Sequence, residues 1–143
     1  MDQETITGLN KVRKILADKK YSVVIIKNGE IIEKQKGKGL SPLIKIVEKR
    51  SNEIKNSVVG DMILGKASAM ICAHAGVKAV YSPKATKQAI AILITKNIPV
   101  QVDKIVPYIK NSEGNDICPF EKILEDVNQI EEAYKILKEK IKV

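Results

Sequence analysis

The sequence predicts an α/β fold, a three-layer α-β-α arrangement with a mixed sheet of about five strands. Two β-branched runs flank Asn28-Gly29, which is the strongest short-range signal of a β-hairpin. From Val58 to Val106, short apolar runs alternate with helical patterns, as in parallel strands joined by helical crossovers. We therefore expect a hairpin to continue into parallel strands, with helices on both faces of the sheet.

The first half of the chain is expected to form a helix, the hairpin and a second helix. The second helix follows a Lys36-Gly37-Lys38-Gly39 turn, and Ser41-Pro42 gives it an N-cap and a proline at its first position. In chain order, these elements are a helix near residues 4–18, strands Tyr21–Lys27 and Glu30–Gln35, and a helix from Ser41 to about Ser51.

The second half alternates strands and helices. The helix Lys66–Ala75 is apolar on all sides, so it must be buried, and Gly76 ends it as the C′ residue. The other expected elements are strands Val58–Leu64, Val77–Tyr81 and Val100–Val106, a helix from Ser82-Pro83 to Asn97, a short helix opened by Cys118-Pro119, and an amphipathic helix carrying Ile130, Tyr134, Leu137 and Ile141.

Size and composition indicate one globular domain spanning residues 1–143. Hydrophobic residues make up 44% of the chain and charged residues 29%, which is unlike a disordered protein. No apolar run is long enough to cross a membrane, and the acidic N-terminus does not have the pattern of a signal peptide. Two cysteines are too few for a disulfide framework, so we expect a cytoplasmic protein.

The formal net charge of +8 raises the question of a nucleic-acid partner. Of the 25 lysine and arginine residues, only Arg13 and Arg50 are arginine. Bidentate recognition of bases is mainly a property of arginine. The chain has one Phe, four Tyr and no Trp, so platforms for base stacking are scarce. The composition therefore argues against nucleic acid. A homodimer through a sheet edge or the last helix stays open.

The carboxyl ends of the strands are the expected location of a site. Ligands of such sheets lie there against helix N-termini, and Gly65-Lys66 and Ser82-Pro83 are expected to be two such N-termini. Gly60–Ala67, GDMILGKA, nearly matches a phosphate-binding loop. However, Ala67 stands where a magnesium-binding hydroxyl is needed, and Met62-Ile63-Leu64 resembles a strand. A nucleotide triphosphatase is therefore not expected.

A lysine at a helix start is unfavourable unless an anion compensates its charge. For Lys66 this anion is either the carboxylate of Asp61 across the turn or an anionic ligand. An exposed Lys66 whose charge is screened by solvent is the alternative.

The cysteines and the single histidine suggest neither a metal site nor a complete nucleophile. Cys72 and His74 are two positions apart on a helix and so face different directions, and no metal or other cofactor is expected. Cys118 precedes a helix start, which favours the thiolate, but catalysis would need a base and His74 is the sole histidine. In the alternative interpretation, Cys118 caps the helix and Glu121 completes a contact like that of a capping box.

Several motifs resemble those of an uncharacterised domain-of-unknown-function family with a cytidine deaminase-like fold. They cover most of residues 21–125, and the pair Gly-Lys-Ala-x-Ala and Cys-Pro-x-Glu is the most specific part. The matching residues are Gly39-Leu40-Ser41-Pro42-Leu43, Asp61, Gly65-Lys66-Ala67-Ser68-Ala69, Gly76-Val77, Val80-Tyr81, Asn111, Gly114, Cys118-Pro119 and Glu121.

The resemblance implies the fold of the deaminases without their zinc chemistry. Zinc deaminases carry H-x-E or C-x-E at the first buried helix and P-C-x-x-C at the next. The corresponding segments here are Gly65–Ala69 and Ser82–Thr86, which contain neither the zinc ligands nor the general acid/base glutamate. Zinc-dependent deamination is therefore not expected.

The leading hypothesis is a zinc-free domain that binds a small anionic or nucleotide-derived ligand at these helix starts. A group transferase or hydrolase with Cys118 or Lys66 as nucleophile is one alternative, and a basic interaction module is another. The sequence leaves open whether the chain is an enzyme. The expected ligand-binding residues are Lys66 for charge, Gly65 for close approach, Ser68, Ser82 and Thr86 for hydrogen bonds, Asp61 to orient Lys66, and Cys118 and Glu121 at the rim.

Overall fold

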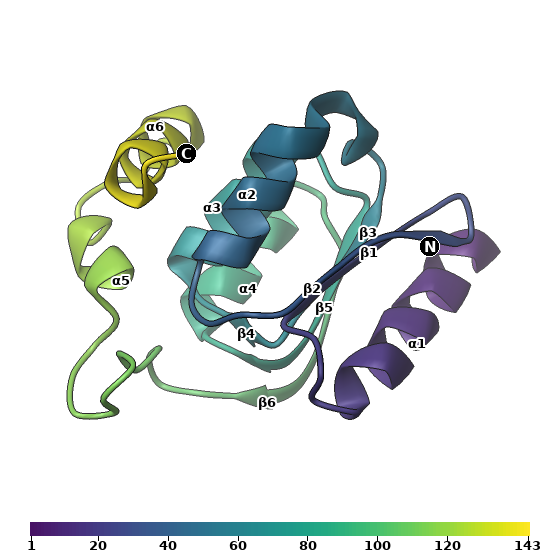
Figure 1. The fold of residues 1–143 in the computed structure, drawn as a ribbon, viewed down its shortest axis with the longest axis horizontal. Helices are drawn as coiled ribbons and strands as arrows, with labels where there is room; N and C mark the ends of the chain where they lie inside the picture. Colours follow the sequence, from purple (N-terminus) through teal and green to yellow (C-terminus); the bar gives the residue numbers. More distant parts are fainter.

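The computed structural model describes residues 1–143 (Figure 1). Its helices are α1 (Gln3–Ala17), α2 (Ser41–Arg50), the short 3-10 helix η1 (Ser51–Glu53), α3 (Lys66–Ala75), α4 (Lys87–Thr95), α5 (Pro119–Ile123) and α6 (Ile130–Ile141). Its strands are β1 (Val23–Lys27), β2 (Glu30–Gln35), β3 (Val58–Asp61), β4 (Ile63–Leu64), β5 (Ala79–Ala85) and β6 (Val100–Ile105).

All six strands belong to one mixed sheet. The hairpin β1–β2 and the pair β1–β3 are antiparallel, whereas β5 is parallel to β3, β4 and β6. β3 and β4 lie end to end along one side of β5, and β6 lies along its other side. The predicted hairpin and the parallel strands joined by helical crossovers are therefore confirmed.

The strand expected over Val58–Leu64 is interrupted at Met62. Gly60 pairs with Tyr81 and Ile63 with Lys84, so the register is the same on both sides of the break and places Met62 opposite Pro83. Proline has no N–H to donate to a ladder, and we attribute the interruption to this missing donor. The sheet therefore has six strands rather than about five.

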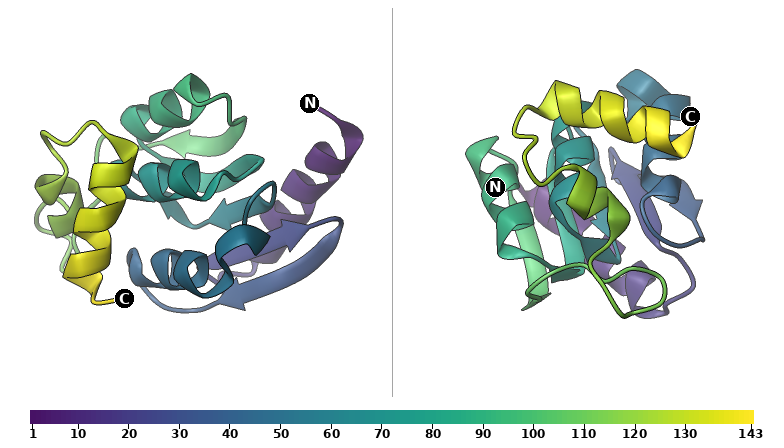
Figure 2. Two further views of the ribbon diagram at one scale, coloured as in Figure 1. Left: turned by 90° about the horizontal axis from the view of Figure 1, so that it is seen from above. Right: turned by 90° about the vertical axis from the view of Figure 1, so that its left-hand side faces the viewer.

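Helices cover both faces of the sheet, as the three-layer prediction requires. α1 alone packs on one face, against β1, β3 and β5, and α2, α3 and α4 cover the other (Figures 1 and 2). α5 and α6 lie beyond α3, so α3 is enclosed between the sheet and the C-terminal helices (Figure 2). The predicted burial of α3 is confirmed, since every residue from Lys66 to Cys72 is buried. Gly76 ends this helix with φ 69° and ψ 36°, as expected for the C′ glycine.

Two helix starts differ from the prediction. Leu40 is the N-cap of α2 and offers no side-chain hydrogen bond, so Ser41 is the first helical residue instead of the cap. Ser82-Pro83 lies inside β5, and α4 begins only at Lys87 with Thr86 as its N-cap.

None of the helices has the length and apolar character needed to cross a bilayer.

Candidate functional site

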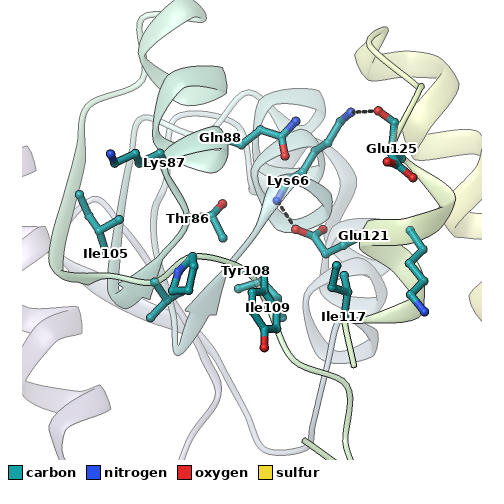
Figure 3. A pocket seen from close by; sticks show the side chains of 13 residues that line it. Lys66, Thr86, Lys87, Gln88, Ile105, Tyr108, Ile109, Ile117, Glu121 and Glu125 are labelled. Carbon is teal, nitrogen blue, oxygen red and sulfur yellow. Dashed lines mark hydrogen bonds between the residues drawn. The ribbon is translucent and has the colours of Figure 1, made fainter. Parts of the chain in front are cut away.

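A cavity of about 700 Å³ lies at the carboxyl ends of β5 and β6 (Figure 3). Its lining residues come from the starts of α3 and α4, the end of β6 and the segment after it, and the region of α5. Of the eight residues predicted to bind a ligand, only Lys66, Thr86 and Glu121 line it. The full lining is Lys66, Thr86, Lys87, Gln88, Ile105, Val106, Pro107, Tyr108, Ile109, Ile117, Glu121, Lys122 and Glu125.

The N-terminus of α3 is occupied by a carboxylate of the chain itself. The backbone N–H of Lys66 donates to Oε1 of Glu121 at 2.8 Å, and that of Ala67 donates to Oε2 at 2.8 Å. An anion at this position is favoured by the helix dipole and by these two donors. The sequence offered Asp61 or an anionic ligand as the anion at Gly65-Lys66. In the structure, the carboxylate at this helix start is that of Glu121, and it contacts the two backbone amides.

The Lys66 side chain points towards the end of α5 (Figure 3). The residue is 3% exposed, and its Nζ donates to the carbonyl oxygen of Leu124 at 2.6 Å and to that of Glu125 at 3.4 Å. No carboxylate lies within 4.0 Å of this ammonium, so the prediction that Asp61 orients Lys66 is wrong. α3 and α5 thus cap each other: Glu121 of α5 holds the start of α3, and Lys66 of α3 holds the end of α5.

Gly65 is needed for this reciprocal capping because it lets Glu121 approach. A Cβ at position 65 would lie 2.3 Å from Oε1 of Glu121 and 2.6 Å from Cγ1 of Ile109. Real Cβ atoms do not approach other atoms this closely. Glu121 and Ile109 thus fill the space beside the Gly65 backbone that the sequence analysis assigned to a ligand.

Asp61, the last residue of β3, and Ser68, in the first turn of α3, are both buried and do not line the cavity. Burial raises the pKa of Asp61 to about 7, although hydrogen bonds from the Ile63 backbone and the Ser68 hydroxyl partly oppose the shift. Burial likewise raises the pKa of Cys72 far above its ordinary value, and the nearby charge of Asp61 adds to the effect. Asp61 therefore supports α3 from the end of β3, through its hydrogen bond with the Ser68 hydroxyl.

Ser82 is fully buried in β5, and its hydroxyl donates to the carbonyl oxygen of Lys84 at 2.7 Å. Because Ser82 is not at a helix start, the predicted pair of converging N-termini is wrong in this half. The N-terminus that reaches the cavity is that of α4. There the Thr86 hydroxyl accepts a hydrogen bond from the backbone N–H of Ala89 at 3.1 Å.

Cys118 is half-buried at the N-cap of α5, but no base accompanies it. His74 lies in the last turn of α3, where its Nδ1 is 2.9 Å from a Glu131 carboxylate oxygen and its ring stacks on Tyr134. The structure therefore does not place His74 beside Cys118. The predicted capping-box contact is also wrong, because the Glu121 carboxylate binds α3 instead of the backbone of its own helix.

Most of the residues that line the cavity were not predicted from the sequence. Lys87 and Gln88 stand in the first turn of α4, and Tyr108 and Ile109 follow β6. A tyrosine directly after the last expected parallel strand was the sequence signal that could have identified Tyr108. No group of three or more His, Cys, Asp or Glu side chains is arranged to hold a metal ion.

Residues 11–141 match the family described as a domain of unknown function, DUF1893. The chain belongs to the DUF1893 family. Its fold also matches the crystal structure of a DUF1893 family protein from Thermotoga maritima at 24% identity, with a TM-score of 0.85 over 98% of this chain and 92% of that one. The expected resemblance to a family of unknown function is therefore confirmed.

More distant solved structures share part of the fold. Acinetobacter baumannii RibD matches 71% of this chain and 36% of its own length, with a TM-score of 0.54 and 14% identity. The dCMP deaminase of the cyanophage S-TIM5 matches 71% of this chain and 99% of its own, with a TM-score of 0.48 and 20% identity. The DUF1893 chain has a deaminase-like α/β fold and lacks the zinc motifs. The comparison with curated proteins gives no significant match.

Proposed function

We propose that this DUF1893 domain binds a small anionic, nucleotide-derived ligand in the cavity between α4 and α5, without zinc. The observation that supports the proposal is the combination of an apolar wall with a helix N-terminus at the carboxyl ends of parallel strands. The cavity of about 700 Å³ has the size of a small-molecule site.

The anionic part of the ligand is assigned to the start of α4. The first turn of this helix has no acidic residue, and the Lys87 ammonium makes no ion pair. The other cations of the lining are engaged, because Lys66 binds backbone carbonyls and Lys122 pairs with Asp116. Lys87 and the helix dipole are therefore the groups that attract a phosphate.

The organic part of the ligand is assigned to the opposite wall. Tyr108 is 43% exposed and Ile117 is 39% exposed, and both line the cavity. An aromatic ring with apolar neighbours can stack on a planar base. An inorganic anion would gain nothing from such a wall, so the wall favours a nucleotide-derived ligand. Lys66 and Glu121 hold the two helices together and so shape the cavity.

The test is a thermal-shift titration with AMP, CMP and GMP against wild-type protein and two single variants, Lys87→Ala and Tyr108→Ala. At 100 times its Kd a ligand adds about 2.7 kcal/mol to the stability, which raises the Tm by roughly 5–10 °C. We expect both variants to reduce this shift. Lys96→Ala, at the other end of α4, is the matched control and should retain it.

The absence of a shift with millimolar concentrations of every nucleotide would contradict the proposal. An equal loss in Lys96→Ala would assign the binding to general charge attraction instead of the cavity. Lys66→Ala is less suitable as a test, because it removes the hydrogen bonds to α5 as well as a charge.

A further inference from the structure

A second concave region, here called the lysine groove, lies between the end of β2 and α2. It has a volume of about 460 Å³. The chain leaves β2 and turns into α2 (Figure 1). The residues that line the groove come from the end of β2, the connecting loop and α2. Four lysines and no acidic residue line it, and Ile46 is its one hydrophobic lining residue. Those lysines are Lys36, Lys38, Lys45 and Lys49.

Three of the four lysines make no ion pair, and Lys36 lies over the Tyr21 ring, 5.9 Å from its centroid. Only Lys49 makes an ion pair, to Glu33 at 3.2 Å, and Arg50 shares the same carboxylate. Lys45 and Lys49 are one turn apart on α2, where like charges repel each other. An anion in the groove would therefore relieve repulsion and neutralise ammonium groups that the fold leaves uncompensated.

The backbone adds to the positive field. α2 begins at the groove with Ser41 and Pro42, its first turn contains no acidic residue, and its N-cap Leu40 gives no side-chain hydrogen bond. Consequently, neither the N-cap side chain nor a carboxylate in the first turn compensates the positive end of this helix dipole.

Two glycines with positive φ shape the loop that carries Lys36 and Lys38. Gly37 has φ 122° and Gly39 has φ 69°, both in the region that disfavours other residues. A Cβ on Gly37 would lie 3.1 Å from Cγ of Pro42, so the loop packs closely on the first turn of α2. Lys36 and Lys38 line the groove together with Lys45.

We propose that the lysine groove binds the polyphosphate group of a small molecule, that is, two or more linked phosphates. Several ammonium groups around one cavity match an anion of high charge density better than a single phosphate. No aromatic side chain lines the groove, so it offers no stacking platform for a base. The site is separate from the cavity at α4, and the proposal is independent of the function proposed for that cavity.

Isothermal titration calorimetry with sodium tripolyphosphate at low salt tests this proposal. The double variant Lys38→Gln/Lys45→Gln should bind about tenfold more weakly or worse. The matched control is Lys14→Gln/Lys20→Gln, which removes two charges at exposed positions that make no ion pair and lie outside the groove. It should bind like wild type. In an amide NMR titration, the shifts should concentrate at Gly37, Gly39 and Leu43.

Four outcomes would overturn the proposal. The first is no binding at millimolar tripolyphosphate, and the second is an equal loss of affinity in the control variant. The third is orthophosphate binding as tightly as tripolyphosphate, because linked phosphates would then not be recognised. The fourth is an oligothymidylate that binds more tightly than tripolyphosphate and depends on Lys38 and Lys45, since the groove would then belong to a nucleic-acid surface.

Discussion

The starts of α3 and α2 show two opposite treatments of a helix N-terminus. At α3, Glu121 reaches across from another helix, and its two carboxylate oxygens accept hydrogen bonds from the first two backbone amides. At α2, no carboxylate is present in the first turn, and the surrounding side chains include Lys38 and Lys45. The first site is closed by the protein itself, whereas the second is concave, cationic and open.

This difference separates residues that maintain the fold from residues available to a ligand. Both helices carry a lysine near their start, Lys66 as the first residue of α3 and Lys45 as the fifth residue of α2. At α3, Lys66 is buried and bound to carbonyl oxygens, so its role is to hold α5 in place. At α2, Lys45 is exposed and has no ion-pair partner. The absence of an internal anion, more than the presence of a lysine, is what indicates a binding site.

The largest expected effect is a pH dependence caused by Asp61, the second carboxylate that supports α3. Its folded-state pKa of about 7 lies above the unfolded value of 3.8, so between these values the folded state binds more protons. Stability should therefore fall as the pH rises from 4 to 7, by up to about 4 kcal/mol. Urea denaturation at a series of pH values measures this loss.

The control is Asp61→Asn, which cannot ionise and should lose this component of the pH dependence. The lowered pKa values of Glu33 and Glu48 act in the opposite direction at lower pH, where stability is lost as these groups protonate. The difference between wild type and variant removes their contribution. Parallel curves for the two proteins from pH 4 to 7 would show that Asp61 titrates normally.

The second effect comes from opening the closed site with Glu121→Ala. The variant loses two charge-assisted hydrogen bonds to the start of α3, which should lower the free energy of unfolding by about 3 kcal/mol. It should also convert α3 into an anion site resembling the one proposed for α2. Acetate or phosphate at tens of millimolar should then stabilise the variant more than wild type.

Glu121→Gln is the matched control, because it keeps the size of the side chain and one acceptor oxygen but removes the charge. It should lose less stability than Glu121→Ala and respond little to acetate. A wild-type melting temperature in Glu121→Ala would show that water replaces the carboxylate without cost, and the contrast between α3 and α2 would disappear.

The third effect is the coupling between Gly65 and Glu121. Gly65→Ala places a Cβ against both Oε1 of Glu121 and Cγ1 of Ile109, at an expected cost of about 2 kcal/mol. In the Glu121→Ala background one of these two clashes is absent, so the substitution should cost about 1 kcal/mol less. A double-mutant cycle by chemical denaturation gives this coupling energy. Strictly additive effects would mean that the clash with Ile109 alone decides the cost.

Local patterns in the sequence were sufficient to predict most of the fold. The Asn28-Gly29 hairpin is predicted from neighbouring residues, and the burial of α3 from its almost wholly small or apolar composition. Both predictions are confirmed. Ser82-Pro83 misled because a serine followed by proline is a helix-start signal only where the strand has already ended. Here the sheet accommodates Pro83 by interrupting the neighbouring strand at Met62.

The candidate site was less predictable because long-range contacts build it. Glu121 binds the amide of a residue 55 positions earlier in the chain, and no local pattern reports such a contact. The spacing from Cys118 to Glu121 suggested a capping box within one helix. That prediction uses only neighbouring residues, whereas the Glu121 carboxylate binds a different helix. The sequence identified the segments Gly65–Ala69 and Cys118–Glu121 as motifs. Only the folded chain shows that Glu121 of the second binds the backbone amides of the first.

The smallest effect tests the open side of the comparison. If the lysine groove holds uncompensated charge, Lys45→Gln should raise the stability of the unliganded protein by a few tenths of a kcal/mol at low salt, because it removes a repulsion with Lys49. Lys135→Gln on α6 is the matched control. Lys135 is four residues from both Glu131 and Glu139, so its removal should lower the stability slightly. Both changes should vanish in 1 M salt, where the Debye length is about 3 Å. Chemical denaturation at two salt concentrations measures them, and a loss of stability in Lys45→Gln at low salt would mean that the fold already neutralises the groove.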